Sequence, residues 1–299
     1  MPDLASPPVS VCLLTYNRAG ALRRSIESLL AQSYANFELI VNDDCSPDNT
    51  AEVCAEYAKK DQRIRYCRNE KNLRYAGNQN AAMARAQFEL VAIVHDGDIY
   101  RTDCVEKWVE ALLSNPRVGI VFNASDALDD TGKVAVKYRH PYPPVLDGRD
   151  MLDEMFRVYS SPIFGIVMVR KALALTAGRF DESYPILADV DMWMRILLRA
   201  DVAYINEPLY QIYPREADHL NRGVNWAILL EQHRIFTSNA VRRFRNEPQE
   251  QKRVLLHLHR KYQMRLLRSC LWALRRGRWR LGWAGVRPLL GSLRGSKMS

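Results

Sequence analysis

Apolar runs alternate with helical segments along the first 122 residues, and this alternation constrains the fold more than any other feature of the sequence. The runs have the length and composition of β-strands, and the segments between them carry apolar residues at helical spacing. In order, the expected elements are a strand at Val9 to Leu14, a helix at Ala21 to Gln32, strands at Phe37 to Val41 and Ile64 to Tyr66, a helix within Asn72 to Ala86, a strand at Leu90 to Val94, a helix at Asp103 to Ser114 and a strand at Val118 to Phe122. This order predicts an α/β fold with a doubly wound, mostly parallel sheet flanked by helices.

Polar residues follow several of these strands directly. Tyr16 comes after the first strand, Asp44 after the second, and Asp96 and Asp98 after the strand that begins at Leu90. Ligands of open α/β sheets bind outside the carboxyl ends of the strands. We therefore expect these four side chains to belong to one site.

The segment from Leu90 to Asp98 has the strongest chemical signature. Its five leading apolar residues show no alternation, as in a strand buried on both faces. In an extended backbone Asp96 and Asp98 point to the same side, where their carboxylates repel each other. A hard divalent cation, Mn²⁺ or Mg²⁺, relieves that repulsion, and Gly97 leaves room for a phosphate beside the backbone. A solvated turn is the alternative interpretation.

The length and composition of the chain limit the class of protein to which it can belong. At 299 residues, with 47% hydrophobic and 26% charged residues, the chain fits a soluble protein with one large α/β domain and an appendage, or with two small domains. The start lacks the apolar core of a signal peptide, and no stretch of about 18 uninterrupted apolar residues occurs. The six scattered cysteines form no CxxC pair, which disfavours a zinc site or a disulfide framework. We therefore expect a cytoplasmic protein.

The net charge of +9 is placed unevenly. From Val241 to Ser299 there are 16 Lys and Arg residues but only 2 Asp and Glu residues. The basic character therefore belongs to the tail, and the chain as a whole does not have the charge distribution of a nucleic-acid-binding protein.

Three motifs together resemble the nucleotide-binding half of a family 2 glycosyltransferase with the GT-A fold. They are the run from Val9 to Arg18, the loop Asp43-Asp44-x-Ser46-x-Asp48, and Asp96-x-Asp98, each placed after an expected strand. The sequence has neither the GxGxxG signature of dinucleotide-binding proteins nor a GxxxxGK phosphate loop. The resemblance covers roughly residues 7 to 222.

The resemblance implies a role for several residues in binding the nucleotide. Tyr16, between Thr15 and Asn17, would stack on the base, and Asp44 would accept a hydrogen bond from a ring N–H. Arg74 would contact the base or the diphosphate. The alternatives are a core aromatic for Tyr16, a helix cap or Asx-turn for Asp44, and an ordinary surface arginine for Arg74.

The resemblance also implies a metal site, although the sequence departs from the family pattern nearby. Cys45 stands where the family usually has glycine or asparagine, and His95 and Gly97 alter the acidic motif. We expect Asp98 to be the principal metal ligand and Asp96 to assist it through water or the ribose. His219 would reach back to the metal or the diphosphate, with a purely structural histidine as the alternative.

In the second half, the run from Leu187 to Arg195 resembles the family's E-D-x-D-L-W-x-R helix start, with Ala188 in place of the usual Glu. By that match Asp189 is the catalytic base, which a sugar hydroxyl needs because it must lose its proton as it attacks an anomeric carbon. Asp191 would cap the helix or hold Arg195. The alternative is that Asp189 is simply the N-cap. We also expect strands at Ile166 to Val169, Val202 to Ile205 and Leu209 to Tyr213.

The tail, residues 223–299, is expected to be helical, with helices at Trp226 to Arg243 and Gln249 to Arg276. Trp272, Trp279 and Trp283 would share one helix face surrounded by arginines. Such a face suits an anionic membrane surface. The alternatives are packing on its own domain and packing on a second subunit, which would make a homo-oligomer.

The sequence therefore predicts a glycosyltransferase domain at residues 1–222, with a nucleotide-binding half at 1–122 and an acceptor half at 123–222, followed by the basic helical extension. The predicted function is inverting, metal-dependent transfer of a sugar from a nucleotide-diphosphate sugar to a hydroxyl of a glycan or lipid-linked acceptor. UDP is the default nucleotide, bacterial surface polysaccharide is the expected product, and the inner face of the cell membrane is the expected place. The alternative is a non-catalytic module that binds nucleotide-sugar or scaffolds a glycan assembly complex, which the replacement of Glu by Ala188 favours.

Overall fold

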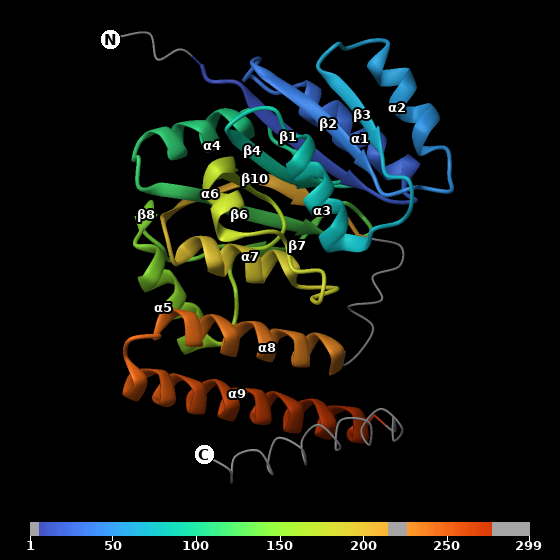
Figure 1. Cartoon of the computed structure of the whole chain (residues 1–299). Coiled ribbons are helices and arrows are strands. Elements are labelled where there is room, and N and C mark those ends of the chain that lie inside the picture. The colour runs from blue at the N-terminus through green and yellow to red at the C-terminus, as the bar shows by residue number, and fades with distance from the viewer. Residues whose placement is uncertain (1–5, 215–225, 277–299) are drawn as a thin grey trace. The chain divides into compact units, whose positions relative to one another are not determined.

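The computed structural model describes residues 6–214 and 226–276 (Figure 1). Contacts divide the chain into two compact units. The first unit comprises Met1–Met151 and Pro162–Arg215, and the second comprises Leu152–Ser161 and Glu216–Ser299. The boundary expected at residues 222 and 223 lies outside the described residues, and so does His219.

The first unit is built on a mixed sheet with the order β3-β2-β1-β4-β9-β6-β10-β5, in which β7 also pairs with β6 and β8 with β10. The strands are β1 (Val9–Thr15), β2 (Phe37–Asp43), β3 (Ile64–Arg68), β4 (Leu90–His95), β5 (Ile99–Tyr100), β6 (Val118–Leu128), β7 (Val134–Tyr138), β8 (Val145–Leu146), β9 (Val167–Arg170) and β10 (Asp201–Ile212). Strands β3, β2, β1 and β4 are parallel to one another, as are β6 and β10. The predicted α/β fold with a mostly parallel sheet is confirmed.

Helices cover both faces of the sheet because successive residues of a buried strand point to opposite sides. Val9, Val11 and Leu13 of β1 belong to the core shared with α1, α2 and α4. Cys12 faces the other way, where its thiol donates a hydrogen bond to a carbonyl of α3 (3.6 Å to Ala82 O). The helices of this unit are α1 (Ala19–Leu30), α2 (Thr50–Ala58), α3 (Arg74–Arg85), α4 (Cys104–Leu113), α5 (Gly148–Val158), α6 (Lys171–Ala177) and α7 (Ala188–Leu197), of which α5 runs on into the second unit.

The acceptor half departs from the expected strands in two respects. Strand β9 lies between β4 and β6 and is antiparallel to both. The two strands expected at Val202 to Ile205 and Leu209 to Tyr213 form one strand, β10, whose register with β6 shifts around Pro208. Proline has no N–H for the ladder, so a break in register at this position is physically reasonable.

Helix α7 is buried along its whole length, so its charged residues must find partners inside the protein. The Arg195 guanidinium pairs with the Asp191 carboxylate at 2.8 Å and donates to the carbonyl oxygens of Ala177 and Arg179. This confirms the expectation that Asp191 holds Arg195.

The second unit contains α8 (Trp226–Arg243) and α9 (Pro248–Arg275), which pack against each other. At their interface the His233 ring stacks on Tyr262 with centroids 4.3 Å apart. No helix in the described part of the chain is long and apolar enough to cross a membrane. Of the three tryptophans expected to share a helix face, Trp272 lies in α9, and Trp279 and Trp283 lie outside the described residues.

We predict that Gly148→Ala destabilises the protein. A Cβ at Gly148 would lie 2.0 Å from the Ala200 carbonyl oxygen and 2.3 Å from that of Leu197, and neither backbone can rotate away. Urea denaturation should show a loss of about 1–3 kcal/mol in the free energy of unfolding. The matched control is Gly20→Ala in α1, where a Cβ meets nothing within 4 Å and the substitution should add about 0.5 kcal/mol. Equal stability of the two variants would contradict the close packing at Gly148.

Candidate functional site

Backbone hydrogen bonds align the ends of three parallel strands. Thr15, the last residue of β1, pairs in register with Asp43 of β2. The ladder continues one residue further on each side, because the Asp44 N–H donates to Thr15 O (3.0 Å) and the Asp96 N–H donates to Leu14 O (3.1 Å). Thr15, Asp44 and Asp96 are thereby brought together at the carboxyl edge of the sheet.

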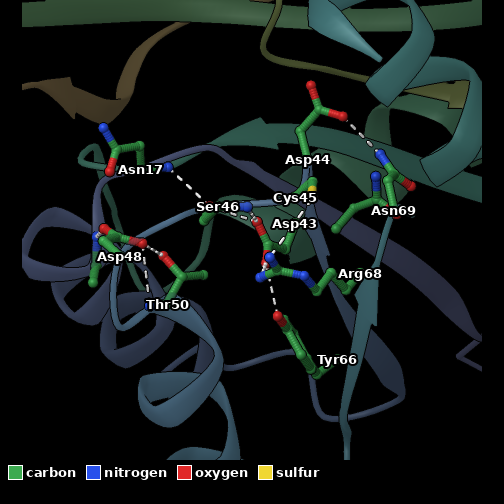
Figure 2. Close-up of polar contacts among 12 residues, drawn as sticks. Asn17, Asp43, Asp44, Cys45, Ser46, Asp48, Thr50, Tyr66, Arg68 and Asn69 are labelled. Atoms are coloured by element: carbon green, nitrogen blue, oxygen red, sulfur yellow. Dashed lines mark hydrogen bonds and ion pairs between the residues drawn. The ribbon is translucent and has the colours of Figure 1, made fainter. Parts of the chain in front are cut away.

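A buried carboxylate organises the loop after β2 (Figure 2). Asp43, fully buried, accepts hydrogen bonds from the Ser46 N–H (2.9 Å), the Tyr66 hydroxyl (2.7 Å) and Arg68 (3.1 Å). Burial and the hydrogen bond with Asp43 raise the pKa of Tyr66 to about 12. Asp43 therefore fixes the loop from inside the protein, and Asp44, the next residue, lies at the edge of the loop.

The Asp48 carboxylate holds the other end of the same loop. It accepts hydrogen bonds from the Ala19 N–H (2.9 Å) and the Thr50 hydroxyl (2.6 Å) at the starts of α1 and α2. Burial raises the pKa of Asp48, but these hydrogen bonds outweigh it and keep that pKa below its ordinary value. One carboxylate thus orients two helix starts beside the expected nucleotide site.

Asp44 makes two contacts through one oxygen. Its Oδ1 accepts from the Asn69 side-chain amide and from the Leu73 N–H, both at 2.8 Å, and Figure 2 shows the first of these. Leu73 is the N-cap residue of α3 and Asn49 that of α2, so Asp44 is not itself a helix cap, although it holds the N–H of the residue at which α3 begins. Because both described partners use Oδ1, a ligand could still approach Oδ2.

The side chains expected to bind a base surround this loop. Tyr16 is 45% exposed, so the alternative that it is a core aromatic is wrong. Asn17, Cys45 and Arg74 have positive φ angles of 54°, 65° and 62°. A left-handed conformation costs a residue with a side chain roughly 1–2 kcal/mol. Cys45 therefore adopts a conformation that favours the glycine or asparagine usual in the resembling family, and Asn17 is held by a hydrogen bond to Ser46 Oγ (2.8 Å).

Arg18 neutralises Asp96, a contact that the sequence analysis did not predict. Its guanidinium lies 2.6 Å from Asp96 Oδ1 and also donates to the Asp96 carbonyl at 3.1 Å. The Thr15 hydroxyl donates to Asp96 Oδ2 at 2.8 Å. Arg18 belongs to the motif from Val9 to Arg18 and lies three residues after the end of β1, but the sequence did not identify Asp96 as its partner.

Gly97 has a left-handed backbone, which favours glycine, and Arg18 lies close to it. Its φ is 87°, and a Cβ there would lie 2.6 Å from the Arg18 guanidinium. The space expected to admit a phosphate is thus filled by Arg18 in this structure. Ser25 of α1 fixes the turn, since its Oγ accepts from the Gly97 N–H and donates to the Asp98 carbonyl.

Asp98 is almost fully buried, at 1% exposure. Its Oδ1 lies 3.4 Å from the Tyr213 N–H after β10. Burial, with the nearby Asp98 charge, raises the pKa of both the Tyr100 and the Tyr210 hydroxyls. These tyrosines therefore stay neutral beside the carboxylate.

Asp96 and Asp98 are the described residues that could hold a divalent metal. Their oxygen donors suit Mn²⁺ or Mg²⁺. No group of three His, Cys, Asp or Glu side chains comes together as a metal site in residues 6–214 and 226–276. Asp98 fits the role better than Asp96, because Arg18 already compensates the Asp96 charge.

Asp189 lies at the start of α7 and is 5% exposed. Leu187 occupies the N-cap position, so the alternative that Asp189 is the N-cap is wrong. The Tyr75 hydroxyl of α3 lies 3.3 Å from Asp189 Oδ2 and 3.4 Å from His95 Nε2 at the end of β4. Tyr75 thus links the expected base to the acidic motif, and neither Tyr75 nor His95 was expected to have this role.

Gly165 makes room for this link. A Cβ at position 165 would lie 2.2 Å from His95 Cε1 and 2.6 Å from the Tyr75 hydroxyl. The two rings meet edge to face with centroids 5.8 Å apart. The base side and the acidic side of the site therefore share one packed cluster.

A sequence profile described as "Glycosyl transferase family 2" matches residues 10–174, more than half of the chain. An uncharacterized protein of Mycobacterium tuberculosis, MT1568, is 29% identical over 215 residues, which are 69% of this chain and 66% of that protein. TuaG of Bacillus subtilis, a glycosyltransferase with a proposed role in teichuronic acid biosynthesis, is 36% identical over 107 residues, covering 36% of this chain and 42% of TuaG. The matched regions thus span about two thirds or less of these curated relatives.

Two solved structures have a similar fold. The first is S. aureus TarS 1-349 in complex with UDP-GlcNAc, with a TM-score of 0.65, 17% identity and coverage of 97% of this chain and 92% of the TarS 1-349 chain. The second is the mannosyltransferase PcManGT of Pyrobaculum calidifontis in complex with GDP-Man and Mn²⁺, with a TM-score of 0.56, 18% identity and coverage of 95% and 75%. At these identities the likeness establishes the fold alone.

Proposed function

The chain belongs to glycosyl transferase family 2, and we propose that it is an inverting glycosyltransferase that moves a sugar from a nucleotide-diphosphate sugar to an acceptor hydroxyl. The observation that carries this proposal is the cluster of Asp189, Tyr75 and His95, which joins the start of α7 to the acidic motif at the end of β4. A transferase needs its base close to the place where the diphosphate leaves. This cluster puts Asp189, the proposed base, close to the acidic motif proposed to hold the metal beside the diphosphate.

Asp189 is the base in the proposed reaction. The acceptor oxygen attacks the anomeric carbon from the face opposite the diphosphate, the bond from that carbon to the diphosphate oxygen breaks, and the acceptor proton passes to the Asp189 carboxylate. The start of α7 favours the ionised carboxylate. Tyr75 orients it by donating from its hydroxyl. Inversion follows from the family resemblance and not from a measured geometry.

The nucleotide lies, in this proposal, over the loop after β2. Exposed Tyr16 stacks on the base, and Asp44 Oδ2 accepts a ring N–H. Thr15 and Asn17 fix the backbone beside them, and Arg74 meets the diphosphate. UDP remains the default nucleotide, which the UDP-GlcNAc complex of TarS supports, while GDP-Man in PcManGT keeps a second base open.

A divalent cation, Mn²⁺ or Mg²⁺, would be held by Asp98 with help from Asp96, and by His219 from outside the described residues. When bound, it would neutralise negative charge on the departing diphosphate. Arg18 supplies a second positive charge at the same place, since it lies against Asp96. The Mn²⁺ in PcManGT supports this assignment.

The proposed acceptor is a hydroxyl of a glycan or lipid-linked glycan in bacterial surface polysaccharide synthesis, which the role proposed for TuaG supports. The enzyme would act in the cytoplasm at the inner face of the membrane. One observation favours the alternative, a non-catalytic binding module. Ala188, fully buried at the start of α7, stands where the family usually has Glu. The substitution of Asp189 separates these two functions.

We predict that Asp189→Asn lowers the rate of UDP release from a UDP-sugar by about 100- to 10,000-fold while leaving UDP affinity unchanged, because only the proton acceptor is lost. Tyr75→Phe should lower the same rate roughly tenfold, since it removes a hydrogen bond to a charged group. Steady-state kinetics and calorimetry with UDP measure the two quantities.

The matched control for these substitutions is Asp150→Asn, which changes an exposed acid in the first turn of α5. It should leave both the rate and the affinity unchanged. If Asp189→Asn retains full turnover, Asp189 is not the base. If the unaltered protein binds UDP and never turns over a sugar donor, the binding module is the better description.

A second prediction separates metal-dependent from metal-independent nucleotide binding. Asp98→Asn should weaken UDP binding at least about tenfold in the presence of Mn²⁺ and much less in its absence. Tyr16→Ala should weaken binding roughly tenfold under both conditions, because base stacking contributes about 1–3 kcal/mol. Calorimetry with and without Mn²⁺ measures both effects.

Tyr138→Ala is the matched control, because Tyr138 is 43% exposed on β7 and Tyr16 is 45% exposed. It should bind UDP as the unaltered protein does. An Asp98→Asn variant that binds UDP equally well with Mn²⁺ would remove Asp98 from the metal site.

A further inference from the structure

Helix α9 carries a row of exposed apolar side chains along one face. Leu256, Met264, Leu267 and Leu271 are 47%, 50%, 41% and 44% exposed. Their spacings of eight, three and four residues keep them on one side of the helix. The buried residues Leu258, Tyr262, Leu266 and Cys270 recur at intervals of four and form a different side. The exposed row is about 22 Å long at roughly 1.5 Å per residue.

Exposed cations flank this row, and no acidic residue occurs from Gln251 to Arg276. Seven of the exposed residues of this stretch are basic, namely Lys252, Arg253, Arg260, Lys261, Arg268, Arg275 and Arg276. Arg253 pairs with Glu250 in the first turn of the helix. Of the other exposed cations, Arg260 lies within the apolar row, four residues after Leu256 and four before Met264, and the rest are spread along the helix around it.

Among the described residues of the second unit, α9 packs through a different side from this face. The opposite side of α9 packs against α8, where Tyr262 stacks on His233. Arg265 is turned inward, with its guanidinium 4.9 Å from the Tyr159 ring centroid and a hydrogen bond to Gln232. Arg265 thus packs inside the second unit, whereas the exposed cations contact only residues of α9 itself where a contact is described, as Arg253 does with Glu250 and Arg276 does with the Trp272 ring (4.7 Å to the centroid).

The combination of an apolar row and an acid-free basic border limits what can cover the face. A second copy joined by two-fold symmetry would place this basic surface against itself, which like-charge repulsion opposes. A nucleic acid would use the cations but would leave the row of Leu and Met side chains without a partner. An anionic bilayer uses both, since apolar side chains enter the boundary of the acyl region while cations meet the headgroups.

We propose that the outer face of α9, defined by Leu256, Arg260, Met264, Leu267, Arg268 and Leu271, docks on an anionic phospholipid surface with the helix lying in the plane of the membrane. This inference names the contact surface for the membrane-associated enzyme proposed above. It rests on α9 and not on the chemistry of the candidate site. An enzyme that binds nucleotide without docking and a protein that docks without turnover are therefore distinguishable.

The test is co-sedimentation of the full chain with vesicles of phosphatidylcholine alone or mixed with an equal part of phosphatidylglycerol. The unaltered protein should sediment with the mixed vesicles and stay in solution with the neutral ones. The double substitution Arg260→Glu and Arg268→Glu should weaken binding about tenfold or more, because each cation near an anionic surface contributes on the order of a few-fold in affinity. Leu267→Ser with Leu271→Ser should weaken the binding that remains at high salt, where charge is screened.

The matched control is Arg149→Glu with Leu175→Ser, which changes an exposed cation and an exposed leucine of the first unit. This variant should sediment as the unaltered protein does. Every variant should keep the same UDP-dependent rise in melting temperature, which checks the fold independently of docking. Raising salt with the unaltered chain should also lower binding, and this check needs no substitution.

Three results would overturn the proposal. The first is equal sedimentation with neutral and anionic vesicles. The second is binding to anionic vesicles that neither α9 variant changes. The third is a change of oligomeric state in the α9 variants during analytical ultracentrifugation without vesicles, which would assign the face to a contact between copies of the chain.

Discussion

The parallel pairing of β1 with β2 and β4 is the constraint on which the candidate site depends. Two backbone hydrogen bonds beyond the strands, from Asp44 to Thr15 and from Asp96 to Leu14, set the polar residues of three separate segments at one level. A slip of one residue in a buried strand would turn each side chain to the opposite face. The hydrogen bond from the Thr15 hydroxyl to the Asp96 carboxylate therefore depends on the register of β1 with β4 and would be lost if that register changed.

The acidic groups at this edge are each compensated in a different way. Asp43 is buried and satisfied by hydrogen bonds from the loop and from Tyr66, so it acts as structure. Asp96 has a cation of its own in Arg18. Asp189 sits at a helix start and meets the Tyr75 hydroxyl. Asp98 is the most buried of the proposed functional carboxylates, and the metal assignment centres on it because Arg18 already compensates the charge of Asp96.

The sequence predicted what depends on local pattern. Uninterrupted apolar runs identified the parallel strands, and their ends identified Asp44, Asp96 and Asp98. It did not predict the direction of β9, because an apolar run of four residues carries no information about orientation. It also missed the contacts of Arg18 with Asp96 and of Tyr75 with Asp189, whose partners are 78 and 114 residues apart. Such pairs depend on tertiary packing, which spacing along the chain does not record.

The insertion of β9 between β4 and β6 has a consequence for how the protein is made. During synthesis, β4 emerges long before β9, and until β9 arrives the edge of β4 has unpaired backbone groups. A ribosome-bound chain that ends before residue 167 therefore exposes an apolar strand edge of the kind that recruits other chains. We expect this nascent stage to be the one at which the protein most needs a chaperone.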